Sequence, residues 1–335
     1  MGAAGGFAML SRVAENMFWM CRYLERADDV RRMLSVNHFL VLERSPDLAS
    51  QWLPMIEVTG DLPLFNSLYS EATRENILQF LCLREDNPNS IFSCLIQGRE
   101  NARAVREKLP IEIWEAINSA YHYVQSVDQQ AVLADPLPFF TELRIAQERI
   151  HGTLHSCFSQ TDPWHFCQLA IHLERADKAT RILDVKYFLL LPSLADVGGS
   201  VDVLGWEALL RSVSGLTMFR QQMHKITAAN VLNFLLFDKY FPRSMLHCLI
   251  QADQTVQLLS GETPMDVLRF PNQAAKQVGQ LLARLRFTTI DEVFKTGTHE
   301  FMNELQISLN QVGEAVFHTF FNGSPATHSS QGNAQ

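Results

Sequence analysis

The sequence has no long apolar run, no alternating strand pattern and none of the common nucleotide- or zinc-binding motifs. The apolar stretch Tyr187 to Leu191 stops at Pro192, and no apolar run approaches the ~20 residues of a membrane-spanning helix. The chain contains no GxxxxGK[ST], GxGxxG or HExxH, which argues against the standard nucleotide-binding loops and zinc peptidase sites. Without strand alternation or hairpin turns, helical periodicity is the dominant pattern along the chain.

Cysteine pairs and metal-ligand clusters are also missing. The six cysteines form no CxxC motif and sit in apolar helical patterns, so we expect reduced core thiols and a cytoplasmic location. His151 and His155 have the i, i+4 spacing of a metal-binding pair, but no carboxylate partner is evident. We therefore predict no metal site and no other cofactor.

Positive charge is scarce for a protein of this size. Lys and Arg number 28 against 36 Asp and Glu, a net charge of −8, which argues against a general nucleic-acid binder. The first residues, MGAAGGFA, lack the basic region of a signal peptide. We expect residues 1–8 to be a leader or a cloning remnant before a natural start at Met9.

The main positive feature is an internal repeat. Trp19 to Leu42 and Gln168 to Leu191 align at a shift of 149 residues, with eleven identities over twenty positions and LERAD in both copies. A second pair of blocks, Asn76 to Gln97 and Asn230 to Gln251, aligns at a shift of 154 with ten identities over twenty-two positions. We interpret both as the duplication of one supersecondary unit.

Each copy of the first repeat places a polar stripe on one helix face. Its acids and arginine fall at i, i+3 and i+7 and therefore share a face. With the arginine that follows each glutamate, the candidate binding residues are Glu25, Arg26, Asp28, Arg32, Glu174, Arg175, Asp177 and Arg181.

Two interpretations of these stripes stay open. One is a solvated helix face, where an exposed i, i+4 ion pair contributes only ~0.3–0.5 kcal/mol. The other is that the two stripes face each other across a pseudo-twofold axis, or line a shared cleft. Neighbours that differ between the copies, such as Asp29 against Lys178 and Arg31 against Thr180, are expected to be solvated.

A second polar stripe occurs only in the first half. Arg99, Arg103 and Arg106 are spaced i, i+4, i+7, so we predict three guanidinium groups on one helix face, with Asn101 beside them. Arginine forks suit a carboxylate or a phosphate. The alternative is that these arginines pair with acids of the first helix in a polar seam.

The periodicity predicts an all-α fold, a bundle of about ten to twelve helices in two pseudo-equivalent halves. We expect a first helical repeat over 9–161, a second over 162–321 packed with it as one unit, and a disordered tail over 322–335. The first helix should run from Ser11 to Leu42, and Ser45-Pro46-Asp47 should start the next. That next helix should stop near Gly60, before a loop at Asp61-Leu62-Pro63. Further helices are expected at 111–131, 137–160, 163–191, 265–286 and 290–321.

Several blocks together resemble the bacterial alpha-E family, an all-helical family named for its Glu-Arg motif. In order between Met9 and Phe321 they are MLSRVAENMFWMCRYLERADD, CLIQGRENARAVREKLPIEIWEAIN, WHFCQLAIHLERAD and FMNELQISLNQVGEAVFHTFF. The motif residues are Glu25-Arg26 and Glu174-Arg175. The family's Gly-Arg-Tyr before the second LERAD is Ala170-Ile171-His172 here, so an arginine at that point survives only as Arg22.

The resemblance implies companionship with circularly permuted ATP-grasp ligases and transglutaminase-like proteins in peptide synthesis or modification. Our first hypothesis is a non-catalytic helical partner of such an enzyme, whose polar stripes dock the partner or hold an anionic peptide. The second is an enzyme with Glu25 or Glu174 as general acid or base, which requires a raised pKa. The third is a purely structural ion-pair seam, which would bury the two stripes against each other.

Overall fold

The computed structural model describes residues 4–42, 52–189, 199–261 and 272–322, and all regular structure in these ranges is helical. The predicted all-α fold is confirmed, but the described residues form sixteen α-helices, more than the predicted ten to twelve. The first half contains α1 (Ala4–Leu42), α2 (Leu53–Thr59), α3 (Leu62–Leu68), α4 (Arg74–Leu78), α5 (Ile91–Ala104), α6 (Ile111–Ser126), α7 (Gln129–Ala134) and α8 (Leu137–Ser156).

The second half is built from helices of similar order and length. They are α9 (Asp162–Leu189), α10 (Ser200–Ser212), α11 (Leu216–Gln222), α12 (Ala228–Phe237), α13 (Met245–Leu259), α14 (Gln273–Phe287), α15 (Ile290–Thr296) and α16 (Thr298–Val316). Short π-helical turns follow α4 (Gln79–Leu83) and α16 (Phe317–Phe321), and a 3-10 turn (Arg106–Lys108) follows α5.

The count exceeds the prediction partly because two predicted helices are each divided. The run 111–131 breaks at Val127, whose backbone is extended, and the Asp128 side chain then caps α7. The run 290–321 breaks at Gly297, whose φ of 98° lies outside the helical region. The first break spans Val127 and Asp128, and the second is Gly297 alone.

Other boundaries also differ from the expected ones. Helix α1 begins at Ala4, so residues 4–8 of the expected leader belong to it. Leu62-Pro63, expected in a loop, opens α3, where a proline in the first turn gives up no helical hydrogen bond. The helix start predicted at Ser45-Pro46-Asp47 lies outside the described residues, as does the predicted tail from residue 323 onward.

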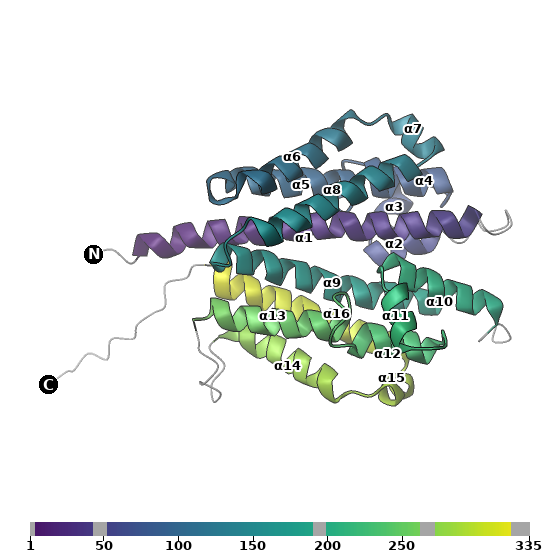
Figure 1. Ribbon diagram of the computed structural model, residues 1–335. Coiled ribbons are helices and arrows are strands. Elements are labelled where there is room, and N and C mark those ends of the chain that lie inside the picture. The colour runs from purple at the N-terminus through teal and green to yellow at the C-terminus, as the bar shows by residue number, and fades with distance from the viewer. Residues whose placement is uncertain (1–3, 43–51, 190–198, 262–271, 323–335) are drawn as a thin grey trace.

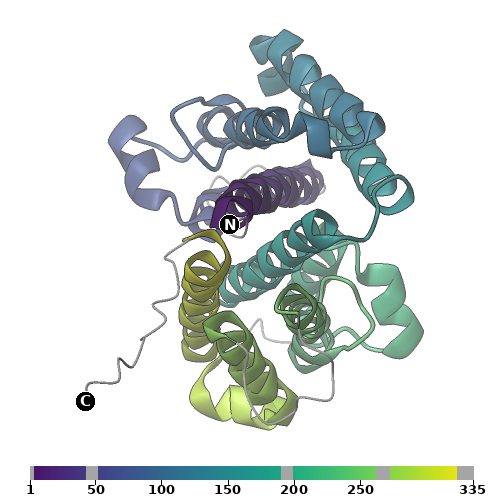
Figure 2. The same ribbon diagram turned by 90° about the vertical axis from the view of Figure 1, so that its left-hand side faces the viewer.

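The long helices α1 and α9 lie side by side and run in the same direction through the middle of the molecule (Figure 1). The other first-half helices pack on one side of this pair and the other second-half helices on the opposite side (Figure 2). Both central helices are therefore covered on most faces, and a covered helix has little solvated surface for its polar residues.

This placement overturns the expectation that the residues beside the two stripes are solvated. Asp29 and Arg31 are only 4% and 5% exposed, and Lys178 and Thr180 are 5% and 0% exposed. A helical wheel gives the direction of a side chain but not what covers it. Here Asp29 pairs with Arg243 in the turn before α13, and Arg31 lies beside residues of α5, α6 and α8.

Local contacts recur between the halves at the shift of 154 residues. Gly60 after α2 and Ser214 after α10 both have positive φ, 81° and 55°. Edge-to-face ring pairs also recur, with centroids 5.2 Å apart for Phe65–Phe80 and 5.5 Å apart for Phe219–Phe234. Each fully buried aromatic side chain of this kind contributes roughly 1.5–3 kcal/mol.

Five of the six cysteines are buried free thiols, as expected, but Cys157 is exposed at the end of α8. Among the described helices, none combines the length and the apolar character that crossing a membrane requires. The cytoplasmic location stays a prediction.

Candidate functional site

Two reciprocal ion pairs join the central helices. Arg26 of α1 donates from Nε and Nη2 to the two carboxylate oxygens of Glu174 on α9, at 2.8 and 3.2 Å. Arg175 of α9 donates in the same way to Glu25 of α1, at 2.7 and 3.2 Å. We call these four residues the Glu–Arg clamp. The clamp brings the two repeated motifs into direct contact, across the boundary between the halves.

Both glutamates of the clamp are fully buried. Burial alone would raise the pKa of Glu174, but Arg22, Arg26 and Lys178 outweigh it and lower the pKa to about 2. Arg22 Nε lies 2.6 Å from a Glu174 oxygen, while Lys178 Nζ is 3.9 Å away. Glu174 is therefore an ionised carboxylate at any physiological pH.

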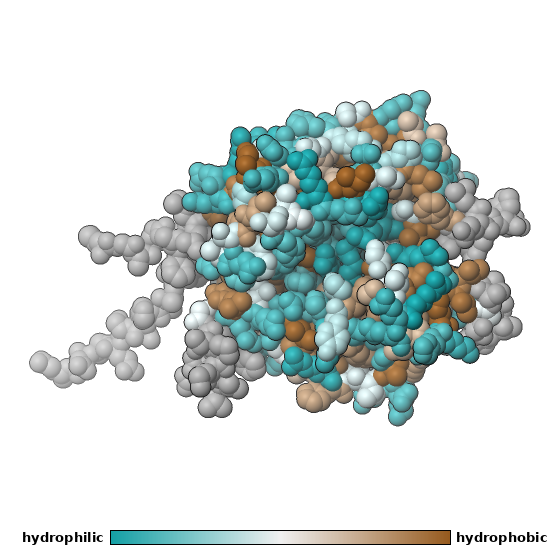
Figure 3. Space-filling view, in the orientation of Figure 1, coloured by the Kyte–Doolittle hydropathy of each residue, from teal (hydrophilic) through white to brown (hydrophobic). Residues whose placement is uncertain are grey.

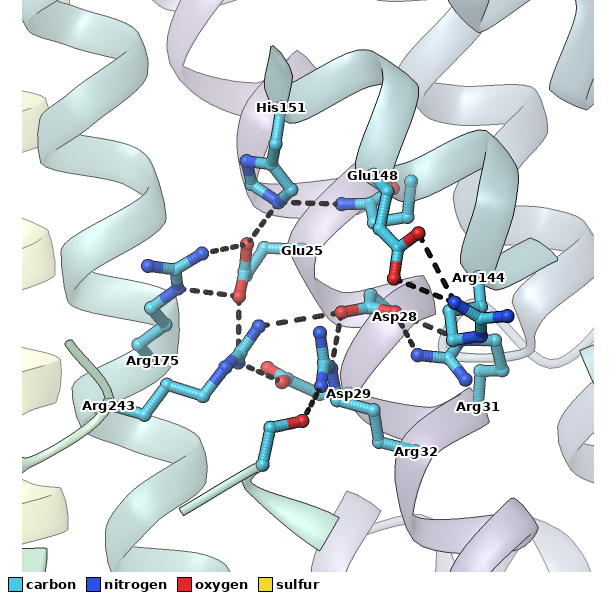
Figure 4. A network of polar contacts seen from close by, with 12 residues as sticks. Glu25, Asp28, Asp29, Arg31, Arg32, Arg144, Glu148, His151, Arg175 and Arg243 are labelled. Atoms are coloured by element: carbon cyan, nitrogen blue, oxygen red, sulfur yellow. Dashed lines mark hydrogen bonds and ion pairs between the residues drawn. The ribbon is translucent and has the colours of Figure 1, made fainter. Parts of the chain in front are cut away.

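Glu25 has a different set of neighbours. Arg243, in the turn before α13, reaches its Oε1 at 2.9 Å, and His151 of α8 reaches its Oε2 at 3.1 Å (Figure 4). Burial would raise the pKa of Glu25, but Arg175, Arg243 and His151 together lower it well below its ordinary value. Glu25 is also held ionised.

Two aspartates extend this network along α1. Asp28 accepts from Arg31 at 2.6 and 2.9 Å and from Arg32 at 2.5 Å. Asp29 pairs with Arg243 at 2.8 Å. Burial and the negative charges of Glu25 and Asp28 outweigh the effect of Arg243 and raise the pKa of Asp29 to about 7.

The corresponding part of α9 carries fewer charges. Arg181 pairs with Asp177 at 2.8 Å, in the i, i+4 geometry that Arg32 and Asp28 adopt on α1. Lys178 takes the place of Asp29 and lies 4.0 Å from Asp177. Arg32 also donates to Ser214 of the second half, so the contact between the halves extends beyond the clamp.

This geometry restricts the chemistry that the clamp residues can perform. All four carboxylate oxygens already accept hydrogen bonds, so a ligand would have to displace an arginine. The acid–base hypothesis required a raised pKa at Glu25 or Glu174, and both values are lowered. In the part of the chain that the structure describes, no group of three His, Cys, Asp or Glu side chains could hold a metal ion.

The arginine stripe of the first half lies elsewhere and is not continuous. Helix α5 ends at Ala104, so Arg106 belongs to the 3-10 turn and does not continue the helix face of Arg99 and Arg103. The predicted stack of three guanidinium groups on one helix is therefore wrong. The alternative, pairing with acids of α1, is not what the structure shows either.

The stripe residues contact nearby groups instead. Arg99 pairs with Glu100 at 2.6 Å and lies over the rings of Trp114 and Tyr121. Arg103 pairs with the same glutamate at 2.5 Å and its side chain is 63% exposed. Arg106 is exposed and lies over Trp114, and Asn101 donates to the backbone of its own helix.

Several network residues were not predicted as site residues from the sequence. Arg243, His151, Asp29, Arg31 and Lys178 all join the network. Arg243 aligns with the neutral Asn89 at the shift of 154, so identity between the copies could not find it. A search for charged residues at repeat positions where the copies differ would have found it.

These features define an all-helical protein whose two halves are joined through paired Glu-Arg helices. The chain belongs to the Alpha-E family, described as a predicted alpha-helical domain with a conserved ER motif, whose model matches residues 9–321. The resemblance to this family noted from the sequence is thus confirmed.

Known relatives are longer than this chain. Uncharacterised proteins of Mycobacterium bovis and of two Mycobacterium tuberculosis strains are 22% identical over 325 residues. The match covers 90% of this chain but 36% of each relative, so the chain spans about a third of their length. No solved structure matches the chain.

Proposed function

We propose that this chain is a non-catalytic helical accessory protein of an ATP-grasp ligase or transglutaminase-like enzyme, in peptide synthesis or modification. The saturation of Glu25 and Glu174 by cations supports the non-catalytic role. A general acid or base has to exchange its proton near the working pH. The pKa values of both glutamates are lowered, so both side chains stay ionised at that pH.

The accessory role is supported by the length of the relatives. In them the matching helical region shares one polypeptide with almost twice as much additional sequence. A helical unit that shares a polypeptide with further sequence is suited to work beside a partner. The class of that partner comes from the family resemblance.

We also infer that the two halves arose by duplication and that the clamp is structural. This explains why each arginine of the motif serves the glutamate of the other copy. It also explains why turns and ring pairs recur at one shift. Losing one member of such a buried pair costs roughly 3–5 kcal/mol, because its partner is left buried and uncompensated.

The docking surface then has to lie outside the clamp, whose side chains are largely buried. We propose that it includes Arg103 and Arg106, which are exposed, and Ile111 at the start of α6, which is 53% exposed. Such a surface offers forks for carboxylates beside an apolar contact, the combination that favours Arg in protein interfaces.

The test is to co-purify the tagged chain with the ATP-grasp or transglutaminase-like protein of its own host and to measure ATP consumption. We expect the isolated chain to consume no ATP and the complex to form with fixed stoichiometry. The double variant Arg103→Glu/Arg106→Glu should release the partner. Arg144→Glu is the matched control, since Arg144 is also exposed and also paired with a glutamate of its own helix.

Three results would count against the proposal. ATP consumption or peptide-bond chemistry by the isolated chain would show that it is an enzyme. Failure of both enzyme classes to co-purify would remove the assigned partner. Equal retention by wild type and by the Arg103/Arg106 variant would remove the docking surface while leaving the accessory role.

A further inference from the structure

The two copies of the clamp differ in what surrounds the arginine. In the first half, Arg26 Nη1 donates to Asn89 at 2.9 Å, and its guanidinium lies 5.8 Å from the centre of the Tyr23 ring. Trp19 packs beside Tyr23, with ring centroids 5.7 Å apart. Every guanidinium nitrogen of Arg26 therefore donates to a protein acceptor, and the Tyr23 and Trp19 rings lie on one side of it.

In the second half the same positions carry other residues. Gln168 replaces Trp19, His172 replaces Tyr23, and Arg243 replaces Asn89 at the repeat shifts. Because an arginine cannot accept a hydrogen bond, the Asn89 contact has no counterpart. Arg175 uses Nε and Nη2 for Glu25, and Nη1 has no acceptor among the described residues. Figure 4 shows that this nitrogen points away from Glu25.

Two further polar atoms near Arg175 are unsatisfied. Gln168 Nε2 and His172 Nδ1 are buried and have no hydrogen-bond partner in the described structure. Their side chains lie at i and i+4 relative to Arg175 at i+7, so the three share a face of α9. Gln168 and His172 are only 7% and 8% exposed, and an unsatisfied buried donor is costly.

The groups near His172 are Arg175, His247, His155 and the Glu25 carboxylate, which is itself paired with Arg175 and Arg243. His247 of α13 lies beside His172, with ring centroids 5.9 Å apart. Burial, with Arg175 and His247 nearby, lowers the pKa of His172 to about 3. His155 of α8 is exposed, and burial, His151 and Arg175 lower its pKa too. Burial is the largest cause of both shifts, and Arg175 adds to both. The guanidinium of Arg175 favours an anion over a metal cation beside His172.

We propose that Arg175, Gln168 and His172, flanked by His155 and His247, bind the oxyanion of a small ligand, a carboxylate or a phosphate group. The Arg175 Nη1 and Gln168 Nε2 hydrogens and the N–H of the His172 ring would supply the donors. The five residues belong to α8, α9 and α13. Figure 3 shows the face of the molecule on which hydrophilic residues gather between α8 and α13. The site needs no partner protein, so it is independent of the accessory role.

The test is calorimetric titration of the full chain with inorganic phosphate and, separately, with succinate. His172→Tyr and His247→Ser restore the residues of the first half, Tyr23 and Ser93, and leave Arg175 in the clamp. His122→Ser, an exposed histidine of α6, is the matched control. Circular dichroism and thermal melting establish that each variant is folded.

We expect one anion per chain for the wild type and for His122→Ser. His172→Tyr, which loses a donor to the anion, should bind it at least about tenfold more weakly. His247→Ser, which loses the ring beside His172, should also bind it more weakly. Phosphate binding identifies a phosphate ligand, and succinate binding without phosphate binding identifies a carboxylate.

Two outcomes would overturn the proposal. One is no measurable binding of either anion to the folded wild type. The other is equal binding by the wild type and His247→Ser. Because His247 is partly exposed, its variant keeps the test decisive even where His172→Tyr does not fold.

Discussion

At the scale of single residues, the cations around Glu25 and Glu174 offset the free-energy cost of burying two carboxylates. An ionised carboxylate removed from water is destabilising unless charges and hydrogen bonds replace its hydration. Glu174 has a bidentate arginine and two more cations, and Glu25 has two arginines and a histidine. Each glutamate thus depends on at least one cation from the other central helix.

The lowered pKa of Glu174 predicts that the protein loses stability as the pH falls, a part of the pH dependence that we call the acid limb. A carboxyl whose pKa falls from 4.5 to about 2 on folding stabilises the folded state at pH values above its unfolded pKa. This stabilisation is lost as the pH falls toward 2. The contribution is about 3 kcal/mol. Urea unfolding between pH 7 and pH 3 should therefore show a smaller loss of stability for Glu174→Gln than for the wild type.

The control for this acid limb is Glu112→Gln, which changes an exposed glutamate of α6. This variant should follow the wild-type pH dependence. If Glu174→Gln also follows it, Glu174 is not the ionised group that we describe.

At the scale of elements, the recurring unit is the capped start of α5 and α13. The Ser90 side chain accepts from the backbone N–H of Ser93, and Ser244 accepts from that of His247. Each hydroxyl also donates to the carbonyl six residues before it, and both serines are completely buried. The two helices that flank the central pair therefore begin with the same two hydrogen bonds.

Removing either cap should cost a similar free energy. We expect Ser90→Ala and Ser244→Ala each to lower the free energy of unfolding by ~1–2 kcal/mol, since each leaves buried groups unsatisfied. The two losses should add in the double variant, because the caps share no partner. Equilibrium urea unfolding measures all three, with Ser126→Ala at an exposed position as the control.

An effect confined to one half would contradict the equivalence of the two units. The contacts at Ser90 and Ser244 would then be similar in geometry but different in energy.

Much of the helical layout could be predicted from the sequence, because periodicity and caps are local. The end of α1 at Leu42, the stop at Gly60 and the long helix α9 all follow the predicted positions. The divisions at Val127 and Gly297 were missed because the apolar pattern continues across both of them. A periodic pattern predicts which face of a helix is buried. It does not predict the backbone angle at which the helix ends.

The site could be predicted only in part for a different reason. The motif identified Glu25, Arg26, Glu174 and Arg175, but their burial depends on the parallel packing of α1 against α9, which no local pattern encodes. Arg243 contacts Glu25 from more than two hundred residues away. Such a contact becomes visible only once the two halves are placed together.

At the scale of the whole molecule, the contact between α1 and α9 joins the two halves. The clamp, the Arg22–Glu174 pair and the Arg243 contacts all cross from one half to the other. A buried, charge-matched contact of this kind fixes the relative position of the halves, because any shift leaves charges uncompensated. This rigidity suits the accessory role that we propose.

The most direct test of this account is the unfolding free energy of Glu25→Gln and Glu174→Gln at pH 7, measured by urea titration. Each substitution keeps the shape of the side chain but removes a buried carboxylate, the one that pairs with Arg175 in Glu25→Gln and the one that pairs with Arg22 and Arg26 in Glu174→Gln. The account predicts a helical fold in both variants and a loss of roughly 3 kcal/mol or more in each. Wild-type stability in both variants would contradict a structural clamp.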